Sequence, residues 1–168
     1  MKGVLLLLFI FSPIWPLGQN PLPGDPFLVV NKKTNELAFI NEGKVQNVYS
    51  VATGKTEELT PVGEFTVIVK AINPYYRKQN IPGGTPKNPL GTRWIGFDAL
   101  GTDGRTYGIH GTNNPESIGR KMTNGCVRLK NEEVEELFSK VPLGTKVVII
   151  NDHVSFEEIG VQYGAIHP

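Results

Sequence analysis

Glycine and proline divide this chain into short apolar segments, and that division limits the folds that it can adopt. The 168 residues include 19 glycines and 13 prolines, and helix-forming stretches are few. This composition favours a turn-rich β protein. The length suits one domain and is sufficient to bury a substantial core.

Several runs have strand character, because they are rich in β-branched and aromatic residues and are bounded by turn residues. These runs are 27–30, 36–40, 45–52, 64–70, 92–98, 105–109 and 146–150. The first three are joined by short segments with Asn and Gly, which tolerate the positive φ of tight turns. We therefore expect a β-meander at the start of the folded part.

Two short helices are expected in the second half of the chain. Residues 114–117 begin with Asn and Pro, which suits a single helical turn. Asn131 can cap a longer helix that has Glu132 and Glu133 in its first turn. The apolar residues of this helix recur with i, i+3, i+4, i+7 spacing until Pro142 stops it.

The chain divides into four parts. Residues 1–20 are expected to be a signal peptide or N-terminal anchor, because Lys2 precedes an apolar run shorter than the roughly 20 residues that span a bilayer. Residues 21–26 form a Pro-rich spacer, and 27–150 form the folded domain. Residues 151–168 have no clear pattern and are expected to be a tail. We therefore predict an exported protein.

The long segment 73–91 is rich in proline and glycine and contains the adjacent pair Tyr75 and Tyr76. Irregular segments of this length in compact domains are often lids or binding loops. We therefore regard 73–91 as a candidate lid or binding loop.

Cys126 is the only cysteine, and its surroundings in the sequence point to chemistry. Exported chains usually pair their cysteines, so a single one is either buried and inert or a reactive thiol. His110 lies 16 positions upstream (126 − 110), and Arg128 follows closely. A cysteine nucleophile needs a nearby base and a group that holds the substrate. These three side chains are therefore the candidate site.

Period-two alternation predicts how these side chains meet. In the segment 107–110, His110 points to the face opposite the core. In the segment 126–129, Cys126 and Arg128 share one face, while the apolar residues between and after them suit the core. One segment therefore offers an imidazole, and the other offers a thiol beside a guanidinium.

Each residue type has a chemical reason to be there. A free thiol has a pKa of about 8.5, and a neighbouring imidazole lowers that pKa or removes the proton during attack. Gly125 lets the backbone bend, so that amides near Cys126 can face a developing oxyanion. Arg128 can hold a carboxylate with two parallel hydrogen bonds. Each residue alone has a simpler, structural interpretation: Cys126 as a buried apolar residue, His110 as a structural histidine and Arg128 as a surface charge. Only their joint placement favours a catalytic site.

At these residues the chain resembles the L,D-transpeptidase catalytic domain family of bacterial cell-wall enzymes. The family pattern is His-Gly followed, about 15 residues on, by Ser-x-Gly-Cys-x-Arg. Here it stands as His-Gly-Thr at 110–112 and Thr-Asn-Gly-Cys-Val-Arg at 123–128. The segments 60–65, 88–91 and 117–119 also match the family. The resemblance covers nearly all of the predicted domain.

The resemblance implies a mostly β fold of the sandwich or barrel-like kind, with one or two short helices, and a reaction. Cys126 would attack the carbonyl of the diamino acid in a tetrapeptide stem and expel D-Ala. The acyl group would then pass to the diamino-acid amine of a neighbouring stem, which makes a cross-link. His110 would be the base, oriented by the carbonyl of Gly111. The amides of Gly125 and Cys126 would form the oxyanion hole, and carbapenems would acylate the thiol.

Arg128, Thr123, Asn124 and Tyr107 would bind the substrate in this resemblance. Two of these positions depart from the family pattern. Thr123 replaces the usual Ser and keeps a hydroxyl, whereas Asn124 stands where many members have His, so a second imidazole is absent. The role of this position is therefore open.

The implied partners are peptidoglycan stem peptides, met at the outer face of the membrane or in the cell wall. Lys and Arg total 17 and Asp and Glu total 16, so the net charge of +1 gives no reason to expect nucleic acid. We expect a monomer without a cofactor. His153 and His167 lie in the predicted tail without clustered ligands, so no metal site is predicted.

Two alternatives remain open at this point. A sortase-like protein transpeptidase also uses Cys, His and Arg, and it would cleave a sorting peptide. A non-catalytic, exported wall-binding module would keep Cys126 as a structural residue, and its thiol would react only after denaturation.

Overall fold

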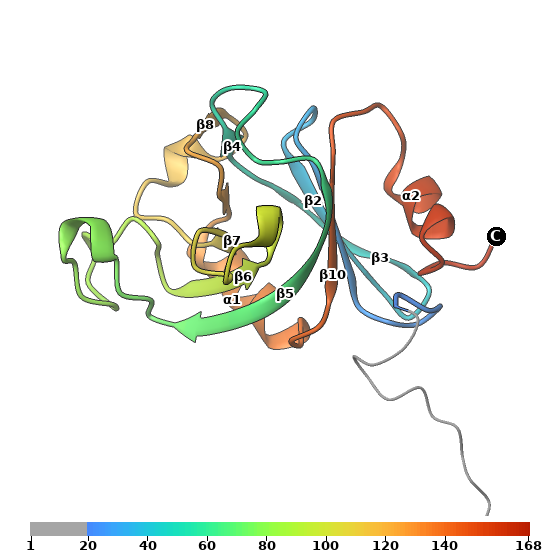
Figure 1. Cartoon of the computed structure of the whole chain (residues 1–168), viewed down its shortest axis with the longest axis horizontal. Helices are drawn as coiled ribbons and strands as arrows, with labels where there is room; N and C mark the ends of the chain where they lie inside the picture. Colours follow the sequence, from blue (N-terminus) through green and yellow to red (C-terminus); the bar gives the residue numbers. More distant parts are fainter. Residues whose placement is uncertain (1–19) are drawn as a thin grey trace, which may run out of the picture.

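The apolar runs of the sequence form one curved sheet of eight strands, in the order β3-β2-β1-β10-β5-β6-β7-β9 (Figure 1). The structure is a computed structural model, and it describes residues 20–168. The predicted signal peptide or anchor lies almost wholly outside the described residues. The strands are β1 (Phe27–Asn31), β2 (Glu36–Asn41), β3 (Lys44–Ser50), β5 (Gly63–Ile72), β6 (Arg93–Phe97), β7 (Tyr107–His110), β9 (Val127–Arg128) and β10 (Lys146–Ile150).

The sheet curls until its two edges meet. Ala52, just after β3, pairs with Arg128 in β9. The amide of Ala52 donates to the carbonyl of Arg128 at 3.0 Å, and the reverse bond measures 2.9 Å. A second, small sheet pairs β4 (Thr53–Gly54) with β8 (Lys121–Thr123) in parallel. This closure confirms the predicted mostly β, barrel-like fold, and it fixes β9 from both sides, because β7 pairs with its other edge.

The main core fills the inside of the curled sheet, and one helix closes it. Helix α1 (Asn131–Lys140) contributes Val134 and Leu137, which are fully buried against strand residues such as Leu28 and Phe39. The predicted helix is thus confirmed. The prediction that Asn131 caps it is wrong, because the N-cap residue is Lys130 and the Asn131 side chain bonds to a neighbouring loop.

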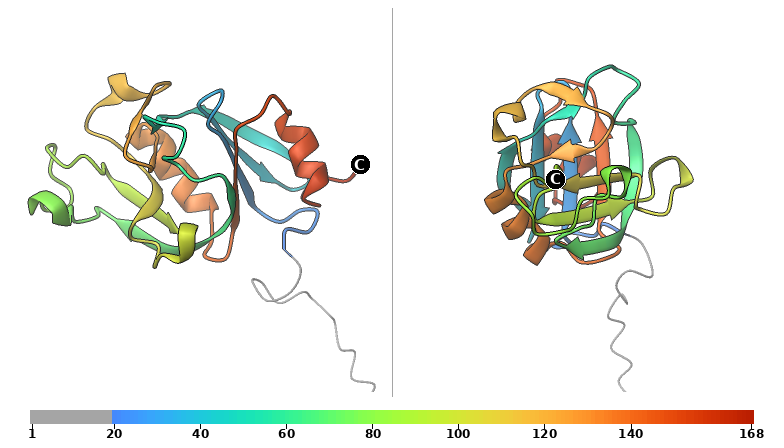
Figure 2. Two further views of the ribbon diagram at one scale, coloured as in Figure 1. Left: turned by 45° about the horizontal axis from the view of Figure 1, so that its top comes forward. Right: turned by 90° about the vertical axis from the view of Figure 1, so that its left-hand side faces the viewer.

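The C-terminal segment is not the unstructured tail that the sequence suggested. It contains helix α2 (Phe156–Gln162), which packs on the outer face of β1, β2 and β10 (Figures 1 and 2). Ile159 and Ala165 are buried there against Val29 and Ile40. The apolar runs of β1, β2 and β10 are therefore covered on both faces, because α1 and the core lie on the other side.

Within residues 20–168, three single turns of 3-10 helix complete the fold. They are η1 (Arg77–Gln79), η2 (Ala99–Gly101) and η3 (Pro115–Ser117). The last one confirms the helical turn predicted at 114–117. Residues 21–26, the predicted spacer, include a turn in which the amide of Asp25 donates to the carbonyl of Leu22 at 2.9 Å. Among residues 20–168, no helix is long and apolar enough to cross a membrane.

Candidate active site

Parallel pairing of β7 with β9 brings the predicted site residues together. In this pairing Ile109 stands opposite Val127, and His110 stands opposite Arg128. Ile109 and Val127 are fully buried in the main core. Since side chains alternate along a strand, His110 and Arg128 lie on the other face, as the alternation predicted. Cys126 immediately precedes β9.

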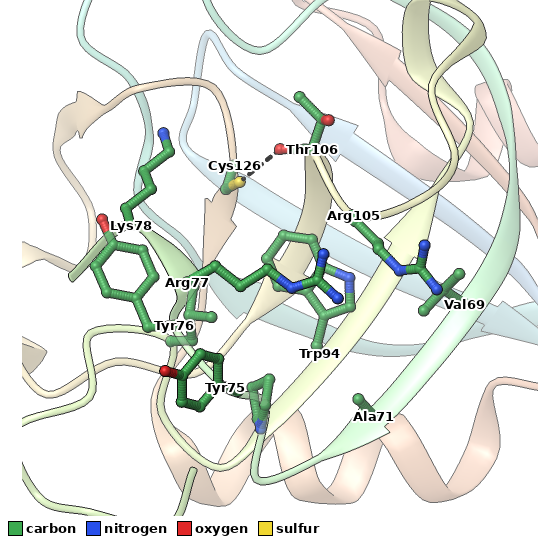
Figure 3. Close-up of a pocket in the computed structure, with 12 residues that line it drawn as sticks. Val69, Ala71, Tyr75, Tyr76, Arg77, Lys78, Trp94, Arg105, Thr106 and Cys126 are labelled. Carbon is green, nitrogen blue, oxygen red and sulfur yellow. Dashed lines mark hydrogen bonds between the residues drawn. The ribbon is translucent and has the colours of Figure 1, made fainter. Parts of the chain in front are cut away.

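The thiol of Cys126 opens into a pocket of about 370 Å³ (Figure 3). The side chain is partly exposed, and its Sγ lies 3.5 Å from the carbonyl oxygen of Thr106. Trp94 lines the same pocket, and the segment 74–78 forms another wall. A buried, inert cysteine would not border such a space, so this placement favours a reactive thiol.

His110 is buried beside the pocket and is held in one orientation. Its ring stacks on Trp94, with centroids 5.5 Å apart and planes at 15°, and the residue is 3% exposed. Nδ1 lies 2.6 Å from the carbonyl oxygen of Gly111. Because a carbonyl can only accept, Nδ1 carries the proton, and Nε2 of the neutral ring keeps its lone pair. This is the contact that was predicted for Gly111. Within residues 20–168, no hydrogen bond joins the thiol to the imidazole.

Burial keeps both groups uncharged at neutral pH. Burial lowers the pKa of His110 to about 4, and the charge of Arg128 adds to this effect, whereas the carbonyls of Gly111 and Leu90 oppose it. Burial raises the pKa of the Cys126 thiol to about 11, and the amide of Gly108, Lys78 and Arg128 oppose it. A resting thiolate–imidazolium pair is therefore disfavoured, and the site holds a neutral thiol and a neutral base.

The turn before β9 is fastened by the hydroxyl of Thr123. This hydroxyl accepts a hydrogen bond from the amide of Gly125 at 3.1 Å and donates to the carbonyl of Cys126 at 2.6 Å. Thr123 is 2% exposed. The prediction that Thr123 binds substrate is therefore not supported, because its polar atoms are used inside the protein. The prediction of an oxyanion donor at Gly125 is also not supported, because the Gly125 amide already donates to the Thr123 hydroxyl. The Cys126 amide, in contrast, has no acceptor within residues 20–168.

The other predicted substrate-binding residues differ in their placement. Tyr107 packs behind the turn: a Cβ at Gly125 would lie 3.2 Å from its Cε1, and Tyr107 does not line the pocket. The predicted contact of Tyr107 with substrate is therefore not supported. Asn124 is exposed. Arg128 is half-buried and does not line the pocket, and its Nε is a buried donor without a hydrogen-bond partner in the described part of the chain.

Asn131 is a site residue that sequence reasoning missed. Its side-chain oxygen accepts from the amides of Thr92 at 3.3 Å and Thr112 at 3.2 Å, and its amide group donates to the Thr112 carbonyl at 3.1 Å. A Cβ at Gly91 or Gly111 would lie within 2.2 Å of that oxygen. The glycine after His110 thus has a packing reason, and its close approach to another element is the signal that could have revealed Asn131.

The segment 73–91 forms one wall of the pocket, so it does border the site. It is tied together by Asn88, which is 1% exposed and donates to the carbonyls of Pro74 at 2.7 Å and Pro82 at 3.2 Å. The oxygen of the same side chain accepts from the amide of Leu90 at 2.9 Å. This internal bonding explains the Asn at the start of the 88–91 motif.

A thiol at the edge of a pocket, a neutral imidazole and a guanidinium on the adjoining strand define a cysteine enzyme of the acyl-transfer class. The sequence model of the L,D-transpeptidase catalytic domain matches residues 25–149. The chain belongs to the L,D-transpeptidase catalytic domain family, and the predicted resemblance is confirmed.

Two similar proteins agree with this assignment. The Bacillus subtilis (strain 168) protein "Putative L,D-transpeptidase YqjB" is 64% identical over 167 residues, which are 99% of this chain and 95% of YqjB. The catalytic domain of the Enterococcus faecium L,D-transpeptidase superposes with a TM-score of 0.59 at 26% identity, over 76% of this chain and 98% of that one.

A solved structure of a more distant relative shares the fold. The L,D-transpeptidase 3 of Mycobacterium tuberculosis, solved with a faropenem-derived adduct, superposes with a TM-score of 0.62 at 17% identity. The match covers 76% of this chain and 61% of that chain. At this identity the likeness concerns the fold alone.

Proposed function

We propose that this protein is a peptidoglycan L,D-transpeptidase that forms cross-links through a thioester on Cys126. The observation that carries the proposal is the position of the only thiol at the edge of a pocket of about 370 Å³, in a chain of this family. The donor is a tetrapeptide stem, and the electrophile is the carbonyl of its diamino acid. The acceptor is the side-chain amine of a diamino acid on a second stem.

In the first step the sulfur of Cys126 bonds to the donor carbonyl carbon, and the C=O electron pair moves onto oxygen. Burial raises the pKa of the thiol and lowers the pKa of His110, so proton transfer before attack is disfavoured. We infer that the thiol proton moves to His110 while the S–C bond forms, since bond formation acidifies the thiol.

His110 then returns the proton to the nitrogen of the leaving D-Ala as the C–N bond breaks, which leaves the thioester. In the second step the acceptor amine attacks the thioester carbonyl and gives a proton to His110, and the sulfur departs and regains that proton. The Gly111 carbonyl stabilises the transient imidazolium through Nδ1–H, at 2.6 Å in the resting site. Water in place of the amine would make the enzyme a carboxypeptidase.

The pocket suits a substrate that carries carboxylates. Its lining includes the cations Arg77, Lys78 and Arg105 and no Asp or Glu. A stem peptide with free carboxylates is complementary to this charge. The half-buried Arg128, which stands opposite His110 and outside the lining of this pocket, is the proposed second anchor for the donor.

The remaining expectations follow from this function. The enzyme would act outside the membrane, exported by means of the segment 1–20, and it would work as a monomer. The family match to residues 25–149 is to the L,D-transpeptidase catalytic domain, so it does not support the sortase-like alternative. The wall-binding alternative requires an inert Cys126, and a partly exposed thiol on a pocket argues against it.

The test is a defined reaction with purified muropeptides. A disaccharide tetrapeptide is incubated with the protein, and mass spectrometry follows D-Ala release and the cross-linked dimer. We expect both products from the wild type and neither from Cys126→Ser, while Lys44→Gln, at an exposed position in β3 outside the pocket, serves as the control. Dimer formation by Cys126→Ser, or D-Ala release that never leads to dimer, would contradict the proposed transpeptidase.

A further inference from the structure

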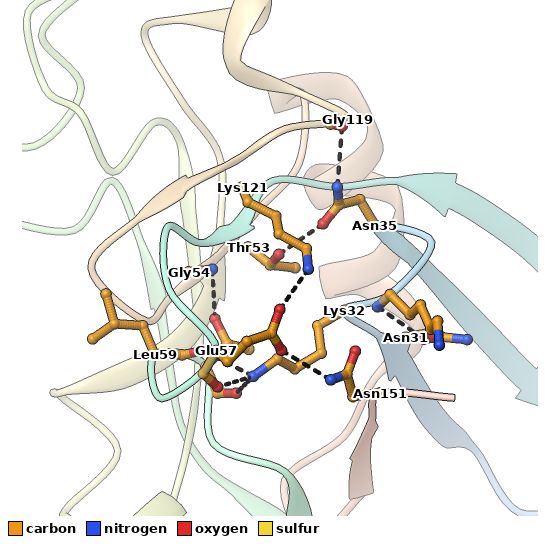
Figure 4. Close-up of polar contacts among 12 residues, drawn as sticks. Asn31, Lys32, Asn35, Thr53, Gly54, Glu57, Leu59, Gly119, Lys121 and Asn151 are labelled. Atoms are coloured by element: carbon orange, nitrogen blue, oxygen red, sulfur yellow. Dashed lines mark hydrogen bonds and ion pairs between the residues drawn. The ribbon is translucent and has the colours of Figure 1, made fainter. Parts of the chain in front are cut away.

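Lys32 is a buried cation that the proposed reaction does not use. It is 2% exposed and follows β1, and its backbone amide donates to the carbonyl of Ile150 at 2.9 Å. Its Nζ donates to the backbone carbonyls of Glu57 at 2.5 Å, Leu59 at 3.2 Å and Thr60 at 3.0 Å (Figure 4). An ammonium has three donors, and all three are satisfied by one loop.

The Glu57 carboxylate does not neutralise this cation by a direct contact. Its oxygens accept instead from Lys121 at 2.9 Å and from the side-chain amide of Asn151 at 2.9 Å (Figure 4). Burial of a charge is costly unless hydrogen bonds compensate it, so the carbonyls of this loop must be held in place around Lys32. The loop ends at Thr60.

Thr60 has an unusual backbone and a fully used hydroxyl. Its φ is +60°, in the left-handed region that disfavours β-branched residues, and it is completely buried. The hydroxyl accepts from the amide of Gly54 at 2.8 Å and donates to the carbonyl of Gly125 at 2.9 Å. Such strain persists only where the surroundings enforce it, and Lys32 bonds to the carbonyl of this same residue.

The bond from Thr60 reaches the peptide group that carries the Cys126 amide. A peptide bond is planar and trans, so its C=O and N–H point in opposite directions. Fixing the carbonyl of Gly125 therefore fixes the direction of the Cys126 amide. Thr123 holds two further backbone groups, the Gly125 amide and the Cys126 carbonyl. Of the amides and carbonyls of Gly125 and Cys126, only the Cys126 amide has no partner within residues 20–168.

We infer that Thr60 is a positioning residue, which aims the Cys126 amide at the oxyanion of the acylation step, and that Lys32 holds Thr60 in this conformation. The inference rests on the proposed acyl-enzyme at Cys126. When the thiol attacks a carbonyl, the oxygen takes up the electron pair and needs a fixed donor. Thr60 touches neither substrate nor sulfur, and it acts only through the Gly125–Cys126 peptide.

Two reactions of the same thiol separate this role from a general loss of structure. A carbapenem acylates Cys126: the S–C bond forms at a carbonyl, an oxyanion develops, and the lactam C–N bond breaks as the nitrogen takes the proton. Iodoacetamide alkylates Cys126 at a saturated carbon: the S–C bond forms, iodide leaves and the thiol proton is released. Only the first reaction needs the amide, so the ratio of the two rate constants reports its direction.

The experiment measures both rate constants by intact-protein mass for the wild type and four variants. Thr60→Val removes both hydrogen bonds at nearly constant volume, and Thr60→Ser keeps them. Lys32→Met removes the cation beneath the loop. Thr145→Val is the matched control, because Thr145 is also fully buried and its hydroxyl donates to the Pro142 carbonyl at 2.8 Å, between α1 and β10.

We expect Thr60→Val to lower the acylation rate at least about 10-fold, since complete loss of an oxyanion donor costs about 10²- to 10³-fold. Its alkylation rate should stay within about 3-fold of wild type. Thr60→Ser should restore the ratio, Lys32→Met should lower it in the same direction, and Thr145→Val should leave it unchanged. Thermal denaturation verifies that each variant is folded, and if Thr60→Val does not fold, Thr60→Ala and Lys32→Met decide the matter.

An unchanged ratio in folded Thr60 and Lys32 variants would overturn the inference, because the two residues would then serve the structure only. Failure of the wild type to be acylated would contradict the proposed function itself, which distinguishes the two outcomes.

Discussion

The two ends of the curved sheet are ordered by different kinds of interaction. At one end, β1, β2 and β10 are covered on both faces, and all five residues of β1 are buried. At the other end, β7 and β9 have one face in the core, and the face with His110 and Arg128 belongs to the site. Buried polar side chains, rather than apolar packing, fix the backbone around that site.

This contrast shows what each kind of interaction can specify. Apolar burial is strong but non-directional, so it stabilises the sheet without aiming any single group. Hydrogen bonds are directional, and the bonds of Thr60, Thr123 and Asn131 fix peptide groups beside Cys126 and His110. Changes at the first end should therefore alter stability, and changes at the second end should alter chemistry.

The largest effect on chemistry is expected from His110→Gln. Glutamine cannot take the thiol proton, so the rate of carbapenem acylation should fall by about 10²- to 10⁴-fold. Intact-protein mass measured against time gives this rate, with the exposed Lys44→Gln, outside the pocket, as the control. A variant that keeps more than a third of the wild-type rate would show that another group acts as the base.

Ile159→Ala in helix α2 is expected to lower the stability of the protein without changing its chemistry. Ile159 is 4% exposed on the outer face of the sheet, and truncation of such a side chain costs about 2–4 kcal/mol of unfolding free energy. Urea denaturation measures the loss, and the half-exposed Val161→Ala serves as the control. The acylation rate of the folded protein should not change, and a parallel fall in rate would break the proposed division between the two ends.

Acidification should destabilise the protein through the buried His110. Burial lowers its pKa from 6.5 to about 4 in the folded state, so the unfolded state binds more protons between these values. The stabilising effect of neutral His110 on the free energy of unfolding is complete above pH 6.5 and is lost as the pH falls towards 4. The total loss is on the order of 3 kcal/mol. Urea denaturation at several pH values should show a steeper acid loss for the wild type than for His110→Gln. Parallel curves would contradict the lowered pKa.

A smaller effect is expected from the charge of the pocket. Arg77→Gln removes one of three lining cations, so the KM for a donor stem with free carboxylates should rise several-fold while kcat changes little. The exposed Lys87→Gln, which does not line the pocket, should leave KM unchanged. Steady-state kinetics with amidated and free donors tests this, and equal KM values for the wild type and Arg77→Gln with both donors would exclude an electrostatic role for Arg77.

Much of the fold could be predicted from the sequence, because periodic apolar residues indicate the strands and helix α1. Helix α2 was missed, since it is short and lies in a segment without an obvious pattern. Two signals for it were present. The apolar run of β1 is continuous, which indicates cover on both faces. Ser155 and Glu158 also form a capping box, which marks a helix start.

The site was predictable only where regular strands carry it. Alternation correctly placed His110 and Arg128 on the same face of the sheet, because His110 lies in the regular strand β7 and Arg128 lies in its neighbour β9. It could not orient Thr123, which was expected to bind substrate, because the turn up to Cys126 is irregular and its hydroxyl bonds inward. The roles of Lys32 and Thr60 were not predicted for a similar reason. They depend on contacts between segments far apart in the sequence, and no local sequence pattern indicates such contacts.

The central claim is that Cys126 forms the acyl-enzyme, and intact-protein mass after incubation with a carbapenem tests it most directly. Because the chain contains one cysteine, the adduct can be located without ambiguity. The wild type should gain the mass of one drug molecule, on the peptide that contains Cys126, and prior alkylation or Cys126→Ser should abolish the gain. An unmodified wild type, or a Cys126→Ser variant modified to the same extent, would contradict the claim.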